Sequence, residues 1–224
     1  MAVPPRPTWK AAMLNTGRVL PAILGATLAL PALTATSAGA AVTDPPPDGV
    51  TVEVAVVNGT GCVQGGMSVY FSVDKQALTL LRDEVRVEVG GGKNPATDRR
   101  TCQVLLRIHV PQGYSYAIKP AVDYRGYAEL EAGASGVLTS SSHLQGTPNP
   151  APKTFKLDGP FSGPWRFQPP DSDPVFKPCG EQRSFVISSD LRVSLGTSDK
   201  TKISYMTMEG KEVYPMVWKR CSTT

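Results

Sequence analysis

Residues 102–130 read CQVLLRIHVPQGYSYAIKPAVDYRGYAEL, the longest run in the chain with a clear strand pattern. The even-numbered residues from 104 to 110 are all apolar, whereas the odd-numbered positions include Arg107 and His109. Such a period of two is typical of a strand with one buried face. Pro-Gln-Gly at 111–113 then supplies turn residues, and a second extended segment with similar alternation follows. We interpret the run as two paired strands joined by a turn.

Apolar and polar residues alternate in the same way on both sides of this run. Further strands are predicted in residues 52–56, 69–73, 85–89, 133–144, 185–195, 203–207 and 213–218. Residues 74–82 fit either a short helix or a strand, and the alternation that follows them favours the strand. Residues 147–178 contain nine prolines, so only short pieces of strand are expected there, at 155–157 and 165–167.

About ten short strands separated by turn residues, without a long helical period, indicate the fold class. We predict an all-β protein, an antiparallel β-sandwich or jelly roll with two disulfides. Three connections are also predicted. The Gly-rich residues 90–100 form a mobile loop, Glu209-Gly210 forms a hairpin-like turn, and the Asp- and Pro-rich residues 41–50 form a flexible lead-in.

The first 40 residues are typical of a secretory signal peptide. Three basic residues and no acidic one precede an apolar run at 19–33, and Ala38-Gly39-Ala40 forms a small-residue cleavage site. The apolar run contains two prolines and is shorter than the ~20 residues that a membrane-spanning helix needs. Translation could start at Met1 or Met13. We expect residues 1–40 to be removed and residues 51–224 to form a single secreted, extracellular domain.

Removal of the signal peptide leaves 184 residues. Three of the 23 basic and none of the 19 acidic residues are lost, so the net charge becomes +1. Neither a basic run nor interleaved basic and aromatic residues are present, so nucleic-acid binding is not expected. No apolar run after residue 40 is long enough for a membrane span. Asn58-Gly59-Thr60 is a formal N-glycosylation acceptor, relevant only in a eukaryotic host.

All four cysteines lie after the expected cleavage site, at Cys62, Cys102, Cys179 and Cys221. An even number of cysteines in an exported chain predicts disulfides. A zinc site would need closely spaced cysteine pairs, which are missing, and no cofactor is expected. Four cysteines allow three pairings. We favour Cys62–Cys102 and Cys179–Cys221, because each bond would then connect neighbouring elements.

Asp123, Arg125 and Tyr127 follow each other at every second position, so they share one face of a predicted strand. Arginine offers a bidentate fork and tyrosine a stacking surface, which together suit a sugar or a carboxylate. The alternative is a solvated strand face with a local ion pair and a packed aromatic ring. An extracellular glycan or protein is the partner that this candidate binding site suggests.

His109 and His143 are the only histidines in the chain. Together with Asp123 they could form a metal site or a base for a serine nucleophile. The sequence contains neither a G-x-S-x-G nucleophile motif nor an H-E-x-x-H metal motif. Metal or triad chemistry is therefore not favoured.

Two groups of carboxylates also suggest chemistry. Asp171-Ser172-Asp173 resembles a fragment of a calcium loop, but the other ligands are missing and a turn is the better interpretation. A glycosidase needs two carboxylates that face each other across a cleft. The available same-strand pairs are Glu129 with Glu131 and Glu84 with Glu88, and exposed glutamates of this kind are more often solubilising.

Several short motifs occur in a fixed order along the chain. They are Gly61-Cys62-Val63-Gln64-Gly65, Cys102-Gln103, Val122-Asp123-Tyr124-Arg125-Gly126-Tyr127, Lys177-Pro178-Cys179-Gly180 and Trp218-Lys219-Arg220-Cys221. This order resembles a family of small secreted four-cysteine proteins known only as a domain of unknown function, family 4360. Val63 stands where that family often has proline, whereas Phe176 fits its aromatic residue before the third cysteine. The resemblance implies export, four cysteines and a β-rich fold, and no activity.

Three functions are compatible with these features. We favour a secreted, non-catalytic β-sandwich that binds a surface, a glycan or a protein, because no catalytic motif is present. The first alternative is a secreted hydrolase with a site built from scattered carboxylates. The second is an extracellular protease inhibitor, for which residues 159–178 offer the candidate exposed loop.

Overall fold

The computed structural model describes residues 44–92, 95–121 and 123–222. All regular elements in these residues are strands. They are β1 (Thr51–Asn58), β2 (Ser68–Phe71), β3 (Ala77–Leu81), β4 (Val85–Gly90), β5 (Thr97–His109), β6 (Tyr114–Ile118), β7 (Tyr124–Leu130), β8 (Ser135–Leu144), β9 (Lys153–Asp158), β10 (Phe161–Phe167), β11 (Phe185–Ser194), β12 (Ile203–Met208) and β13 (Lys211–Arg220). The signal peptide prediction lies outside the described residues.

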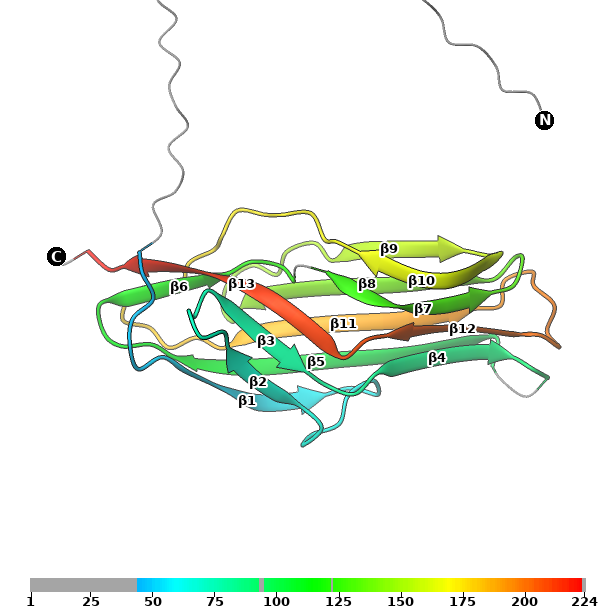
Figure 1. Ribbon diagram of the computed structural model, residues 1–224, viewed down its shortest axis with the longest axis horizontal. Coiled ribbons are helices and arrows are strands. Elements are labelled where there is room, and N and C mark those ends of the chain that lie inside the picture. Colours follow the sequence, from blue (N-terminus) through cyan, green and yellow to red (C-terminus); the bar gives the residue numbers. More distant parts are fainter. Residues whose placement is uncertain (1–43, 93–94, 122, 223–224) are drawn as a thin grey trace, which may run out of the picture. The chain divides into compact units, whose positions relative to one another are not determined.

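The strands form three antiparallel sheets (Figure 1). One sheet has five strands in the order β1-β5-β11-β8-β9. The two others have four strands each, in the orders β10-β7-β12-β4 and β2-β3-β13-β6. The proline-rich segment supplies β9 and β10, and both lie at sheet edges. This placement agrees with the restriction that proline puts on central strands.

The two four-stranded sheets are halves of one bent layer. Three pairs of consecutive strands, β3 with β4, β6 with β7 and β12 with β13, each pass from one half to the other. At the bend, Glu209 N donates to Arg125 O and Arg82 N donates to Gly210 O, both at 2.8 Å. A Cβ atom on Gly210 would lie 1.7 Å from Arg82 O, so the close approach at the bend requires glycine.

Two connections predicted from the sequence were wrong, because in each the chain continues into another sheet where a hairpin was expected. Glu209-Gly210 is not a hairpin turn, because β12 and β13 run on in the same direction and pair with different strands (Figure 1). The run at 102–130 is likewise not a pair of adjacent strands. Its first half, β5, belongs to the five-stranded sheet, and its second half forms β6 and β7 in the bent layer.

Two further segments are more ordered than predicted. Residues 97–100, expected in a mobile loop, begin β5 and pair with β11. The described part of the expected flexible lead-in is also fixed to the domain. Asp44 N donates to Trp218 O at 3.1 Å, Arg220 N donates to Asp44 Oδ2 at 2.7 Å, and Val50 is buried.

The core lies between the five-stranded sheet and the bent layer. Side chains from the two layers meet there: Phe155 of β9 stacks on Trp165 of β10, and Phe185 of β11 meets Tyr214 of β13 edge-on. The alternation predicted for the central strands is confirmed, since Leu106 and its neighbours two residues away are fully buried. The fold is therefore an all-β antiparallel sandwich, as predicted.

Gly126 has a packing role in this core. The indole of Trp165 crosses β7 at Gly126, and its Nε1 donates to Thr207 O on the far side at 3.0 Å. A Cβ atom on Gly126 would lie 2.0 Å from Thr207 O and 2.9 Å from the indole. The glycine in the Tyr-Arg-Gly-Tyr motif thus allows one tryptophan to bridge three strands.

Both disulfides have the pairing that the sequence analysis favoured. Cys62 is bonded to Cys102 with the Cα atoms 5.4 Å apart, and Cys179 to Cys221 with the Cα atoms 6.0 Å apart. The first bond connects the turn after β1 to β5. The second connects the proline-rich segment to the end of β13.

Candidate functional site

The predicted binding residues lie on the solvent side of the sheet β10-β7-β12-β4. We call this surface the tyrosine–arginine face and define it by Arg86, Asp123, Arg125, Tyr127, Arg166 and Tyr205. Arg125 and Tyr127 point outward from β7, and the intervening Gly126 and flanking Tyr124 point to the core. The strand alternation that suggested the site therefore places its residues on one side.

Asp123 forms salt bridges with two arginines. Its Oδ2 atom receives Arg125 Nε at 2.5 Å and Arg166 Nε at 2.7 Å. The Asp123 side chain is 14% exposed, whereas both arginine side chains are about half exposed. The hydrogen bond to Asp123 raises the pKa of Arg125. One carboxylate thus fixes two guanidinium groups whose outer nitrogens face solvent.

Two tyrosines lie beside this arginine pair. Tyr127 of β7 is 41% exposed and stacks on Tyr205 of β12, with ring centroids 6.3 Å apart and planes inclined by 22°. The guanidinium carbon of Arg86 lies 3.7 Å from the Tyr205 ring centroid, and Arg86 Nη2 lies 2.5 Å from Glu88 Oε2. The cation and the adjacent ring hold the Tyr205 side chain in place.

The charges on this face are balanced. Arg86, Arg125 and Arg166 are each paired with a carboxylate. Glu209 also stabilises the charge of Arg125, and the exposed Glu129 lies directly opposite Tyr205 in the strand register. The face therefore offers alternating hydrogen-bond donors and acceptors without a strong excess of either charge.

A cavity of about 200 Å³ lies at the C-terminal end of β8. Apolar residues of several elements line it, together with hydroxyl groups of Tyr124, Ser140 and Ser142 and the ring of His143. Three prolines of the segment 147–170 and Pro120 also contribute. Tyr124, His143, Ser172 and Asp173 line the cavity and stood out in the sequence, but none of them was predicted to form a site of this kind.

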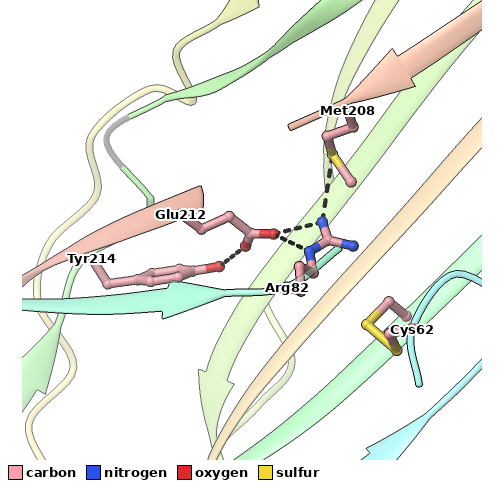
Figure 2. A network of polar contacts seen from close by, with 6 residues as sticks. Cys62, Arg82, Met208, Glu212 and Tyr214 are labelled. Carbon is pink, nitrogen blue, oxygen red and sulfur yellow. Dashed lines mark hydrogen bonds and ion pairs between the residues drawn. A yellow bond between two sulfur atoms is a disulfide. The ribbon is translucent and has the colours of Figure 1, made fainter. Parts of the chain in front are cut away.

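A buried polar chain runs from this cavity into the core, and Figure 2 shows its inner part, formed by Arg82, Glu212 and Tyr214. Arg82 and Glu212 form an ion pair at 2.6 Å with both side chains 2% exposed. Tyr214 donates to Glu212 Oε2 at 2.5 Å. The hydroxyl of Tyr124 interacts with those of Tyr214 and Ser140. Burial raises the pKa of both tyrosines, and the negative charge of Glu212 adds to this effect, so both hydroxyls remain protonated donors.

The structure separates the two histidines. His109 is on β5, where its Nε2 lies 3.9 Å from Glu53 Oε1, and His143 is near the end of β8. Asp123 contacts arginines instead. Within the described ranges, no three His, Cys, Asp or Glu side chains are grouped so that they could hold a metal ion.

Some of the carboxylates noted in the sequence have structural partners. Asp171 lies 2.9 Å from Lys119 Nζ and accepts a hydrogen bond from Ser172 N, as in a turn. Glu131 lies 3.3 Å from Lys202 Nζ. Residues 159–178 are not one exposed loop, because β10 occupies their first part and pairs with β7 along its whole length.

The fold and its two cross-links define the class of protein: a small, disulfide-bonded antiparallel β-sandwich. Residues 48–221 match the family model described as "Domain of unknown function (DUF4360)". The chain belongs to this family.

One curated relative is an "Uncharacterized secreted protein" of Arthroderma benhamiae (strain ATCC MYA-4681 / CBS 112371). It is 28% identical over 185 residues, which cover 80% of this chain and 74% of the relative. A solved structure, TmCBM61 in complex with β-1,4-galactotriose, matches 79% of this chain and 92% of its own at 9% identity. Its TM-score of 0.22 is too low to carry an argument about fold or ligand. Across the residues described, no helix has the length and apolarity to cross a membrane.

Proposed function

We propose that this chain is a secreted, non-catalytic module that binds uncharged glycans through the tyrosine–arginine face. One observation carries the proposal. The half-exposed ring of Tyr127 is held against Tyr205 and lies in a row of arginine–carboxylate pairs. An aromatic ring offers an apolar surface for the C–H face of a sugar, and the charged pairs flank it.

The ion pairs suit the hydroxyl groups of a neutral sugar. In each pair, the outer guanidinium nitrogens donate hydrogen bonds and the carboxylate oxygens accept them. Adjacent sugar hydroxyls need both kinds of partner within a few ångströms. Because Asp123 and Glu209 together offset the charges of Arg125 and Arg166, the face has no strong preference for an anionic ligand.

The same pairing favours binding over hydrolysis. Glycosidases use one carboxylate that holds a proton and a second that acts as base or nucleophile. Asp123 is bound by two arginines at hydrogen-bond distance, so its carboxylate is engaged in orienting their guanidinium groups.

Tyr127→Ala is expected to weaken glycan binding by about ten-fold or more, because the variant removes the exposed stacking ring. The mature protein is first screened on a glycan array, and the best neutral glycan is then titrated by calorimetry. Tyr70→Ala is the matched control, since Tyr70 is 46% exposed on β2, in the other half of the bent layer. Equal losses in both variants, or an array without a neutral ligand, would contradict the proposal.

Export of the chain has its own test. The named relative is a secreted protein, and two disulfides are typical of an oxidising compartment. We expect the exported chain to begin at Ala41 or Val42, directly after the small-residue site. N-terminal sequencing of the protein from culture supernatant measures this. An exported protein that still contains residues 19–33 would refute the signal peptide.

A further inference from the structure

The cavity beside β8 is open because two neighbouring strands end at different places. Pairing between β8 and β9 stops at Ser140 opposite Lys153, whereas β8 continues along β11 as far as Leu144. The following chain turns away, and Thr147 N donates to Leu144 O at 3.0 Å. The segment of β8 beyond Ser140 therefore forms a wall of the cavity in place of a strand neighbour.

The backbone of Ser142 points to this vacated side. Gln145 N donates to Ser184 O at 2.8 Å, so Gln145 directs its backbone groups toward the side of β11. Because backbone groups alternate sides along a strand, those of Ser142 and Leu144 point away from β11. Leu144 O is bound by Thr147, so Ser142 presents the backbone groups beyond the last β8–β9 pair.

Ser140 offers a side-chain acceptor in the cavity wall. It lines the cavity and is the last residue of β8 that pairs with β9. A serine hydroxyl oxygen has lone pairs that accept a hydrogen bond from a donor on a ligand. The end of β8 thus presents the Ser140 oxygen beside the backbone groups of Ser142.

Apolar side chains make up most of the remaining wall, and the volume of the cavity limits the size of the ligand. Ile118, Val175 and Phe185 line the cavity together with prolines. A dry cavity of about 150 Å³ accepts benzene, and pockets for drug-sized molecules begin at roughly 300 Å³. A cavity of about 200 Å³ therefore suits one six-membered ring with a small substituent. Lys153 and Asp173, of opposite charge, both line it, so no single charge is favoured.

We propose that this cavity is a binding site for a small neutral phenol. The ring lies among the apolar side chains, and the phenolic hydroxyl donates to Ser140 Oγ and accepts from Ser142. This site is separate from the tyrosine–arginine face and does not depend on glycan binding. A free sugar fits less well, because its hydroxyl groups would face apolar walls on most sides.

The test compares 4-methylphenol with its methyl ether 4-methylanisole, in which a methyl group replaces the hydroxyl proton. Calorimetric titration of the mature protein should give a dissociation constant of about 1 mM or tighter for the phenol. The ether should bind at least about ten-fold more weakly, because it cannot donate to Ser140. Intermolecular NMR contacts from the ring protons to Val175 and Ile118 should place the phenol. Equal affinity for both probes, or contacts elsewhere on the protein, would overturn the proposal.

A variant pair adds a second readout. Ser140→Ala removes the acceptor, so the preference for phenol over ether should fall to about one. Ser135→Ala, at the other end of β8 and outside the cavity lining, should keep the full preference. An unchanged preference in Ser140→Ala would overturn the proposal. Should Ser140→Ala not fold, the comparison of probes and the NMR contacts in the unaltered protein still decide the question.

Discussion

Glu212→Leu is expected to lower the free energy of unfolding by about 3–5 kcal/mol, the largest effect that a single substitution should have here. Glu212 Oε1 accepts from Arg82 Nε at 2.9 Å and from Arg82 Nη2 at 2.6 Å, with both side chains 2% exposed (Figure 2). Removing the carboxylate leaves the guanidinium charge buried and unpaired. Urea unfolding of the mature protein, followed by tryptophan fluorescence, measures the change.

Two further variants separate the charge from the loss of packing. In the double variant Arg82→Met/Glu212→Leu, Tyr214 loses its acceptor as in the single variant, but no unpaired charge remains. The double variant should therefore be more stable than the single one. Glu53→Gln breaks an ion pair of similar length with Arg107, and it should cost no more than about 1 kcal/mol because both side chains are half exposed. A double variant as unstable as the single would contradict this account.

The buried pair belongs to the bend of the layer. Arg82 lies between β3 and β4, and Glu212 is the second residue of β13. The backbone of Arg82 also binds Gly210 at the same point. The pair thus fixes two crossing segments where regular strand pairing is interrupted. This position explains why a charged pair is retained within a largely apolar core.

Strand positions were predictable because most central strands have one buried face. In β4, β5 and β11 the apolar residues occupy every second position, and the same positions are buried in the structure. The pairing partners of each strand were harder to predict. Glu209-Gly210 has the composition of a turn, but its geometry is set by contacts with Arg82 and Arg125, which are distant in the sequence. A local pattern cannot distinguish a bend within a layer from a hairpin.

The same limit applies to the sites. Asp123, Arg125 and Tyr127 share a face through strand alternation alone, so they could be found in the sequence. Arg166 and Tyr205 join them only through the pairing of β10 and β12 with β7. The cavity depends on where β9 stops relative to β8, which no residue pattern indicates.

The second disulfide holds a segment that has few other attachments. Residues 168–178 form no strand, and Lys177 N donates to Tyr116 O at 2.8 Å just before Cys179. At the other end of the bond, Cys221 N donates to Gly113 O at 2.8 Å. These backbone bonds place both cysteines beside β6. In the unfolded chain nothing keeps the two ends near each other, so the bond restricts a loop with a sequence separation of 42.

Cys179→Ser/Cys221→Ser is therefore expected to cost roughly 2–5 kcal/mol of unfolding free energy, a large part of the 5–15 kcal/mol typical of a domain. The double variant avoids a free thiol, and urea unfolding measures the loss. The Cys62–Cys102 bond closes a loop of nearly the same separation, 40 residues, so chain entropy alone predicts a similar cost for Cys62→Ser/Cys102→Ser. Cys102 is 5% exposed, however, and its replacement by serine also buries a hydroxyl within β5. We expect the Cys62/Cys102 variant to be the less stable of the two, and the reverse order would show that the constraint on the proline-rich segment outweighs the cost in the core.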